Sequence, residues 1–174
     1  MSTPNDVTAA SQPGDWQTVL HFWEKLLKEE AWMPSAAEKQ FAKSLEKSKI
    51  PFQRLVGKLL LLAPFNFKSE DLRMTLSAEL FDESRDFGIF AKNIVFLLVR
   101  LESKALQSEG IIRFVFRLSS SKDPVNRANV VLVLQKIRTE QAFMVLESLA
   151  SDPDHVVRQN ASVALLEWHA SDRE

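Results

Sequence analysis

The chain has 174 residues and a mass of 19.8 kDa, enough for one domain or a short run of stacked repeats but not for two full-sized domains. Its 22 basic and 23 acidic residues give a net charge of -1, which argues against attraction of the whole surface to nucleic acid or an anionic membrane. Because the chain has no cysteine, disulfides, Cys-bound metal centres and thiol nucleophiles are excluded.

Residues 1–14 are polar and lack the basic and apolar regions of a signal peptide, so we expect a flexible tail. We predict one helical domain over residues 15–170, followed by a C-terminal tail over 171–174. The most apolar runs, residues 55–65 and 89–101, are too short and too interrupted to span a membrane. The expected location is cytoplasmic, without membrane attachment.

Apolar residues recur at spacings of three and four along the chain, and hairpin turn signals are absent, so the sequence predicts an all-α protein. Ser35 and Glu38 form a predicted capping box at the second helix. Helix-start signals and apolar periodicity together predict nine helices, over residues 16–31, 35–47, 51–63, 69–81, 86–103, 108–118, 123–137, 139–150 and from 152 onwards.

Amphipathic helices alternate with very apolar ones, a pattern that indicates antiparallel helix pairs stacked into a right-handed α-solenoid. A shift of 31 residues supports this arrangement, because residues 118–134 and 149–165 then share seven identities in 17 positions without a gap. Shifts of 36 and 37 residues extend the register upstream to residues 91–98 and 54–61. The clearest repeats cover residues 111–170.

Residues 154–165 fit a D-x-x-V-R-x-x-A-x-x-A-L pattern, which resembles short bacterial HEAT-like repeats of about 31 residues. The preceding copy, which begins at Asp123, departs from the pattern because Asn126 and Val130 replace the usual Val and Ala. The resemblance implies that the Asp and Arg residues of the pattern join neighbouring repeats at helix starts, a structural role for Asp123, Arg127, Asp154 and Arg158. The alternative is that the two arginines face an anionic partner.

The sequence offers little chemistry for catalysis. Its three histidines lack the spacing of metal ligands, its four glycines are isolated, and its paired carboxylates fall at helix ends or in loops. HEAT-like alkylpurine DNA glycosylases are the enzymatic alternative, but three of the four Trp lie in the first two helices or the joint between them, and the net charge is unsuited to gripping DNA. We therefore expect a non-enzymatic protein without a cofactor or metal.

Charge is uneven along the chain. Residues 38–68 carry seven Lys or Arg against two Glu, whereas residues 139–174 carry seven acidic residues against two Arg. A solvated helix face explains the basic segment simply. The alternative is an anion-binding or nucleic-acid-binding region between Lys39 and Lys58, formed by Lys39, Lys43, Lys47, Arg54 and Lys58.

Two sets of residues are candidates for partner binding. Asn93, Asn129 and Asn160 occupy equivalent places in the second helix of three successive helix pairs. There they could bind a peptide backbone or join the repeats through hydrogen bonds. In the last helix Val156, Val163 and Leu166 lie away from the predicted buried face, where a following repeat would cover them. We expect this patch to contact a partner, a second copy or a larger assembly.

These inferences favour an interaction scaffold or adaptor that binds a protein partner or forms a homo-oligomer through the second-helix face and the C-terminal apolar patch. The alternative is a nucleic-acid-binding protein that uses the Lys39–Lys58 region. The two hypotheses differ in salt dependence, because only phosphate binding weakens steeply as salt is added.

Overall fold

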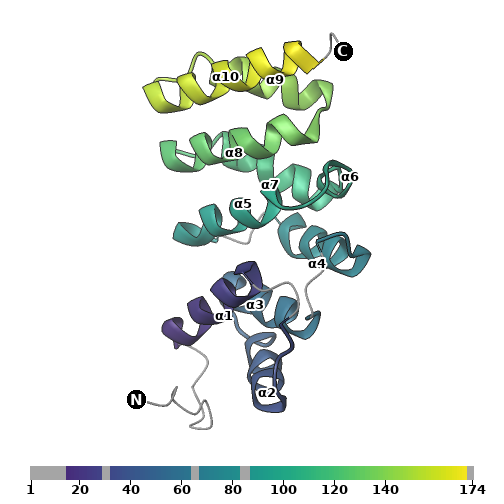
Figure 1. Cartoon of the computed structure of the whole chain (residues 1–174). Coiled ribbons are helices and arrows are strands. Elements are labelled where there is room, and N and C mark those ends of the chain that lie inside the picture. Colours follow the sequence, from purple (N-terminus) through teal and green to yellow (C-terminus); the bar gives the residue numbers. More distant parts are fainter. Residues whose placement is uncertain (1–14, 29–31, 64–66, 83–86, 172–174) are drawn as a thin grey trace, which may run out of the picture. The chain divides into compact units, whose positions relative to one another are not determined.

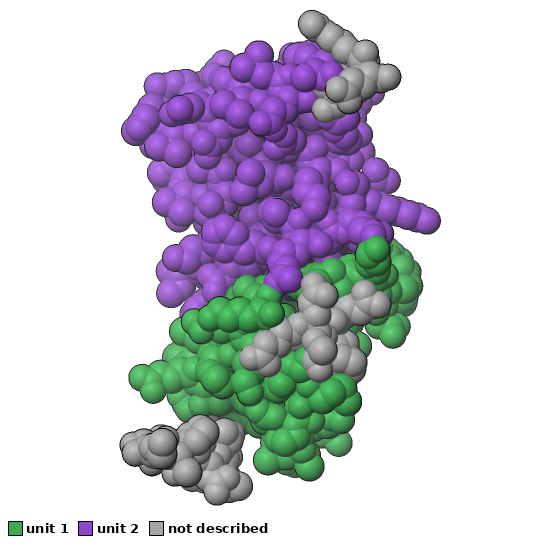
Figure 2. Space-filling model, in the orientation of Figure 1, with its two compact units in different colours: residues 1–75 green, residues 76–174 purple. Residues whose placement is uncertain are grey.

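The computed structural model describes residues 15–28, 32–63, 67–82 and 87–171, which contain ten α-helices and one 3-10 helix and no β-strand. The all-α prediction is confirmed. Both predicted tails, apart from the helical Ser171, lie outside the described residues, as does the end of the first predicted helix. The chain divides into two compact units, residues 1–75 and 76–174, which Figure 2 colours green and purple.

Unit 1 contains α1 (Trp16–Lys28), α2 (Ala36–Leu45) and α3 (Pro51–Leu61), and α3 packs against both other helices. The predicted capping box is present, because the Ser35 side chain accepts the Glu38 N–H and the Glu38 carboxylate accepts the Ser35 N–H. Gly57 allows α3 to approach α2 closely, since a Cβ there would lie 2.7 Å from the Ala42 carbonyl oxygen.

Helix α4 (Glu70–Phe81) crosses the boundary between the units. Unit 2 continues with the 3-10 helix η1 (Gly88–Phe90), α5 (Ala91–Val99), α6 (Ser103–Leu106), α7 (Glu109–Ser119), α8 (Pro124–Ile137), α9 (Glu140–Leu149) and α10 (His155–Ser171). Helices α5, α8 and α10 stack in one layer (Figure 1). Helices α7 and α9 form the other layer, so that α7 pairs with α8 and α9 with α10. Within unit 2 this is the stacking of helix pairs that the sequence predicts for residues 15–170.

The prediction of a single helix over residues 86–103 is wrong. The described part of that segment forms η1 and α5, which ends at Val99, and the separate short helix α6 follows. The Nζ of Lys136 on α8 donates hydrogen bonds to the carbonyls of Val99 and Leu101. A contact across 35 or more residues therefore satisfies the end of α5, and local sequence contains no signal for it.

The core of unit 2 lies between the two layers and consists of aliphatic and aromatic side chains. Phe114 of α7 and Leu134 of α8 are 1% and 0% exposed. Gly110, at the start of α7, sits directly on α4, where its N–H donates to the Ser77 Oγ at 3.1 Å. No helix among the described residues is long and apolar enough to cross a membrane.

Candidate protein-binding surface

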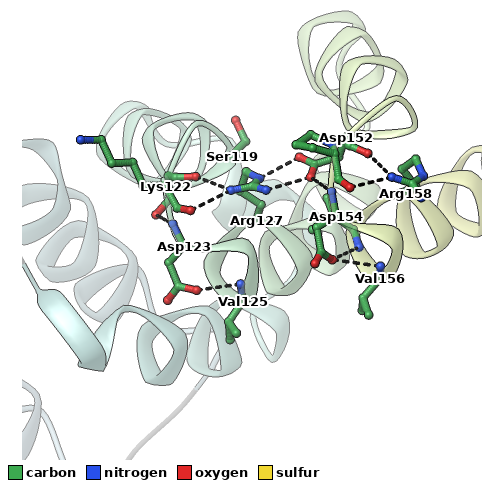
Figure 3. Close-up of polar contacts among 12 residues, drawn as sticks. Ser119, Lys122, Asp123, Val125, Arg127, Asp152, Asp154, Val156 and Arg158 are labelled. Carbon is green, nitrogen blue, oxygen red and sulfur yellow. Dashed lines mark hydrogen bonds and ion pairs between the residues drawn. The ribbon is translucent and has the colours of Figure 1, made fainter.

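A network of arginine side chains at the helix-pair loops fixes the register of the repeats (Figure 3). The Nη1 of Arg127 donates to the carbonyls of Ser121 and Lys122 at 2.7 and 3.1 Å. In the next repeat the Nη1 of Arg158 donates in the same way to the carbonyls of Asp152 and Pro153, at 2.6 and 2.8 Å. Each arginine thus holds the loop that precedes its own helix.

Asp152 joins the two repeats. Its two carboxylate oxygens accept hydrogen bonds from the Nε and Nη2 of Arg127 at 2.7 and 2.8 Å, and one of them also accepts the Asp154 N–H. Hydrogen bonding from Arg127 lowers the pKa of the Asp152 carboxyl below its ordinary value. Asp123 and Asp154 instead cap their own helices, by accepting the N–H groups of Val125 and Val156. Sequence reasoning missed the bridging role of Asp152, because the preceding repeat has Ser121 at that position.

Arg54 repeats the same contact in unit 1. Its Nη1 donates to the Ser48 carbonyl at 3.1 Å, six residues upstream, as Arg127 does to Ser121 and Arg158 to Asp152. Pro51 and Pro124 also occupy equivalent places in the first turns of α3 and α8. This geometry supports the sequence register that aligns α3, α8 and α10, whereas α5 has Ala91 at the arginine position.

In this register the three second helices of unit 2 expose a common pattern of side chains. In α8 and α10 an apolar residue is followed by an Asn four positions later and by another apolar residue three positions after that, and at 100° per residue these positions fall within about 60° on an α-helix. Asn93 and Phe96 lie on α5 at the same spacing, and the apolar residue four positions before Asn93 lies in η1, just before α5. We call the resulting set the ladder surface, and it consists of Ile89, Asn93 and Phe96, then Val125, Asn129 and Leu132, then Val156, Asn160 and Val163.

The apolar members of the ladder surface are unusually open. Ile89 is 80% exposed and Phe96 is 51% exposed. Asn93 and Asn129 are half-buried and Asn160 is exposed, and their side chains make no hydrogen bond within the described part of the chain. The inter-repeat hydrogen bonds considered for these amides are therefore not formed there, and the amides remain available to a ligand.

Val156 and Val163 are exposed to an extent similar to that of their equivalents on α8. Their equivalents on α8, Val125 and Leu132, are 53% and 47% exposed although α10 packs against α8. A following repeat would therefore leave Val156 and Val163 open, and they belong to the ladder surface. Leu166 differs, because its equivalent Gln135 donates from Nε2 to the Glu167 carboxylate on α10. Leu166 is therefore separate from the ladder surface.

The predicted basic region is only partly assembled. Lys39, Lys43 and Lys47 are exposed on α2 and just after it, and the last two line a hollow of about 400 Å³ with Gln40, Ser44 and Ser48. Arg54 and Lys58 lie half-buried on α3, and Arg54 is bound to the Ser48 carbonyl. The described residues contain no cluster of side chains suited to holding a metal ion.

Helix pairs stacked in register, with arginines that hold the loops before α8 and α10, define a helical-repeat protein. A family model described as HEAT repeats matches residues 68–166, more than half of the chain. The chain belongs to this family, and the match begins well upstream of residue 111. HEAT repeats commonly mediate protein–protein interaction and are typically non-catalytic. Comparisons with curated proteins and with solved structures found no match.

Proposed function

We propose that the chain is a non-enzymatic interaction scaffold whose ladder surface binds an amphipathic segment of another protein. This proposal rests on one observation: the face of α3 that is equivalent to the ladder surface is buried within unit 1. The register that aligns Arg54 with Arg127 places Phe52, Val56 and Leu59 at the ladder positions, and these residues are 1%, 0% and 0% exposed. Trp23 of α1 packs on Phe52, with ring centroids 5.1 Å apart.

Helix α1 therefore contributes to covering, on α3, the face that α5, α8 and α10 leave open. It does so with a stripe of buried apolar residues spaced like those of a helix that binds a groove, namely Val19, Phe22, Trp23 and Leu26. The ladder surface has two outer apolar rows and a central row of Asn. The outer rows are Ile89, Val125 and Val156 on one side and Phe96, Leu132 and Val163 on the other. A partner segment with a similar stripe would place its apolar side chains against the two outer rows.

The central row defines the chemistry of the partner further. Val56 occupies the central position on α3, whereas Asn occupies it on the three open helices. An amide buried under a partner needs hydrogen-bonding groups opposite it, so the segment must carry polar atoms between its apolar side chains. The nine ladder residues include no ionisable group, which favours a protein partner over the phosphates of a nucleic acid.

The test uses a displayed peptide library based on the α1 sequence, with the stripe positions varied, selected against the purified chain. We expect the selected peptides to lose at least about tenfold in affinity for L132D, because a charge on the open face cannot pack against an apolar stripe. M144D is the matched control, since Met144 is 62% exposed on α9 in the other layer. Equal loss with both variants, or unchanged binding to L132D, contradicts the proposal.

An anion-binding role for α2 is the second candidate, favoured by the hollow beside Lys43 and Lys47. A fluorescent DNA duplex is the probe. Binding that weakens by an order of magnitude or more between about 50 and 200 mM salt, and that K43E/K47E abolishes, would support it. Binding that is absent, or unaffected by both changes, would contradict it.

A further inference from the structure

An open pocket of about 530 Å³ lies in unit 2 beside the ladder surface, between the start of α5, the end of α7 and the start of α8. We call it the Arg117 pocket. Its wall includes Phe87, Ile89, Phe114, Arg117, Asp123 and Asn126. Because Ile89 also begins the ladder surface, a segment bound there would pass the mouth of the pocket.

The Arg117 guanidinium has no acceptor within the part of the chain that the structure describes, and its Nη1 is buried. Its Cζ lies 5.6 Å from the centroid of the Phe114 ring, so an aromatic face supports the cation. Two other arginines in the described part of unit 2 have partners within the chain. Arg113 pairs with Glu109 at 2.8 Å, and Arg127 binds Asp152. The donors of Arg117 thus differ from these in having no partner among the described residues.

The surroundings of Arg117 favour a group with a single negative charge. Phe87 and Phe114 are buried and pack edge to face at 5.7 Å, so apolar rings border the cation and water screens it less. Asp123 adds a carboxylate to the wall, which disfavours a multiply charged phosphate. Its Oδ1 accepts the Val125 N–H at 2.9 Å, and its Oδ2 accepts no hydrogen bond from a described residue.

We propose that the Arg117 pocket binds the side chain of an Asp or Glu residue carried by the segment on the ladder surface. The planar guanidinium of Arg117 matches a carboxylate, and Asp123 can accept an N–H from the same segment. An acidic residue supplies both groups, the carboxylate from its side chain and the N–H from its backbone. This inference rests on the proposed function for the source of the carboxylate.

The first experiment tests the pocket without a protein partner. The probe is N-acetyl-glutamate N-methylamide, and the signal is the Nε–Hε resonance of Arg117 in the full chain. We expect a saturable shift, no shift with the matching glutamine compound, and no shift of Arg113, which already pairs with Glu109. Absence of a shift overturns the proposal. An equal affinity for free acetate also overturns it, because the pocket would then bind small anions rather than a peptide residue.

The second experiment uses peptides selected on the ladder surface. A Glu-to-Gln change in the peptide should weaken binding to the natural chain by about tenfold and have no effect on binding to R117M. R117M removes a buried donor that lacks a partner, so its melting temperature should not fall, and R117Q provides a second uncharged variant. An equal effect of the peptide change on all three chains overturns the proposal. If no peptide is selected, the proposed function fails while the resonance experiment still decides the pocket.

Discussion

The close contact between α7 and α4 at Gly110 makes G110A a sharp test of the helix stacking in unit 2. A Cβ on residue 110 would lie 1.8 Å from the carbonyl oxygen of Ser77, 2.6 Å from its carbonyl carbon and 2.9 Å from its Cα. All three atoms belong to the backbone of α4, so no side-chain rotation can relieve the overlap. The two helices must separate instead.

The size of the effect follows from that separation. The added carbon must retreat from 1.8 Å to about 3.4 Å, the start of ordinary contact, a movement of about 1.6 Å. Overpacking of this kind costs about 1–3 kcal/mol, and the backbone clash places G110A at or above the upper limit. The better helix propensity of Ala returns about 0.5–1 kcal/mol. We expect a net loss of about 2 kcal/mol, which lowers the melting temperature by about 4–8 °C for a chain of this size.

Thermal and urea unfolding followed by circular dichroism would measure this loss. S148A is the matched control, because Ser148 is exposed on α9 and a change there alters helix propensity without a steric conflict. If G110A were as stable as the natural chain or more stable, the gain in helix propensity would outweigh any steric cost of the added Cβ. The close approach of α7 to α4 would then be wrong.

Three further predictions concern the ion pair between Arg127 and Asp152, the close contact at Gly57 and the ladder surface. Because Arg127 lowers the pKa of Asp152, the pair stabilises the fold above the ordinary carboxyl pKa of about 3.9 and loses that contribution as the pH falls through the lower folded value. The urea concentration at the unfolding midpoint, measured between about pH 7 and 3, should therefore fall less steeply with decreasing pH for D152N than for the natural chain. G57A should also destabilise, but less than G110A, since its closest contact is 2.7 Å, and urea unfolding would rank the two. L132D should change the free energy of unfolding by no more than about 0.5 kcal/mol, because Leu132 is 47% exposed.

Local signals predicted most of the fold. The helix starts at Ser35, Asp123 and Thr139 are confirmed, because in each case the side chain of a capping residue accepts an N–H of the first turn. The prediction of a single helix over residues 86–103 was wrong because a contact distant in sequence, and not a local signal, decides where α5 ends. Lys136 satisfies the carbonyls of Val99 and Leu101 from a distant helix, so the break in the chain depends on tertiary structure that periodicity does not contain.

The candidate site was predicted in part. The sequence register identified Asn93, Asn129 and Asn160 as equivalent, and the same register relates the apolar rows on either side of them. Of those rows the sequence indicated only Val156 and Val163 on the last helix, because apolar residues at helical spacing, such as Phe96 and Leu132, are more often core than surface. Only the exposed fraction of each side chain in the structure distinguishes a surface position from a core position.

The central row of the register distinguishes a covered face from an open one. On α3, where Val56 is buried, an Asn would lose its water without gaining a partner, at a cost of about 1–3 kcal/mol. On α5, α8 and α10 a Val at this position would join the flanking apolar residues into one exposed hydrophobic patch, which favours aggregation. Asn keeps the open face hydrated, and under the proposed partner it would supply hydrogen bonds. The alternation between Val and Asn at equivalent positions is therefore the pattern expected if α1 covers one face permanently and a separate protein covers the others reversibly.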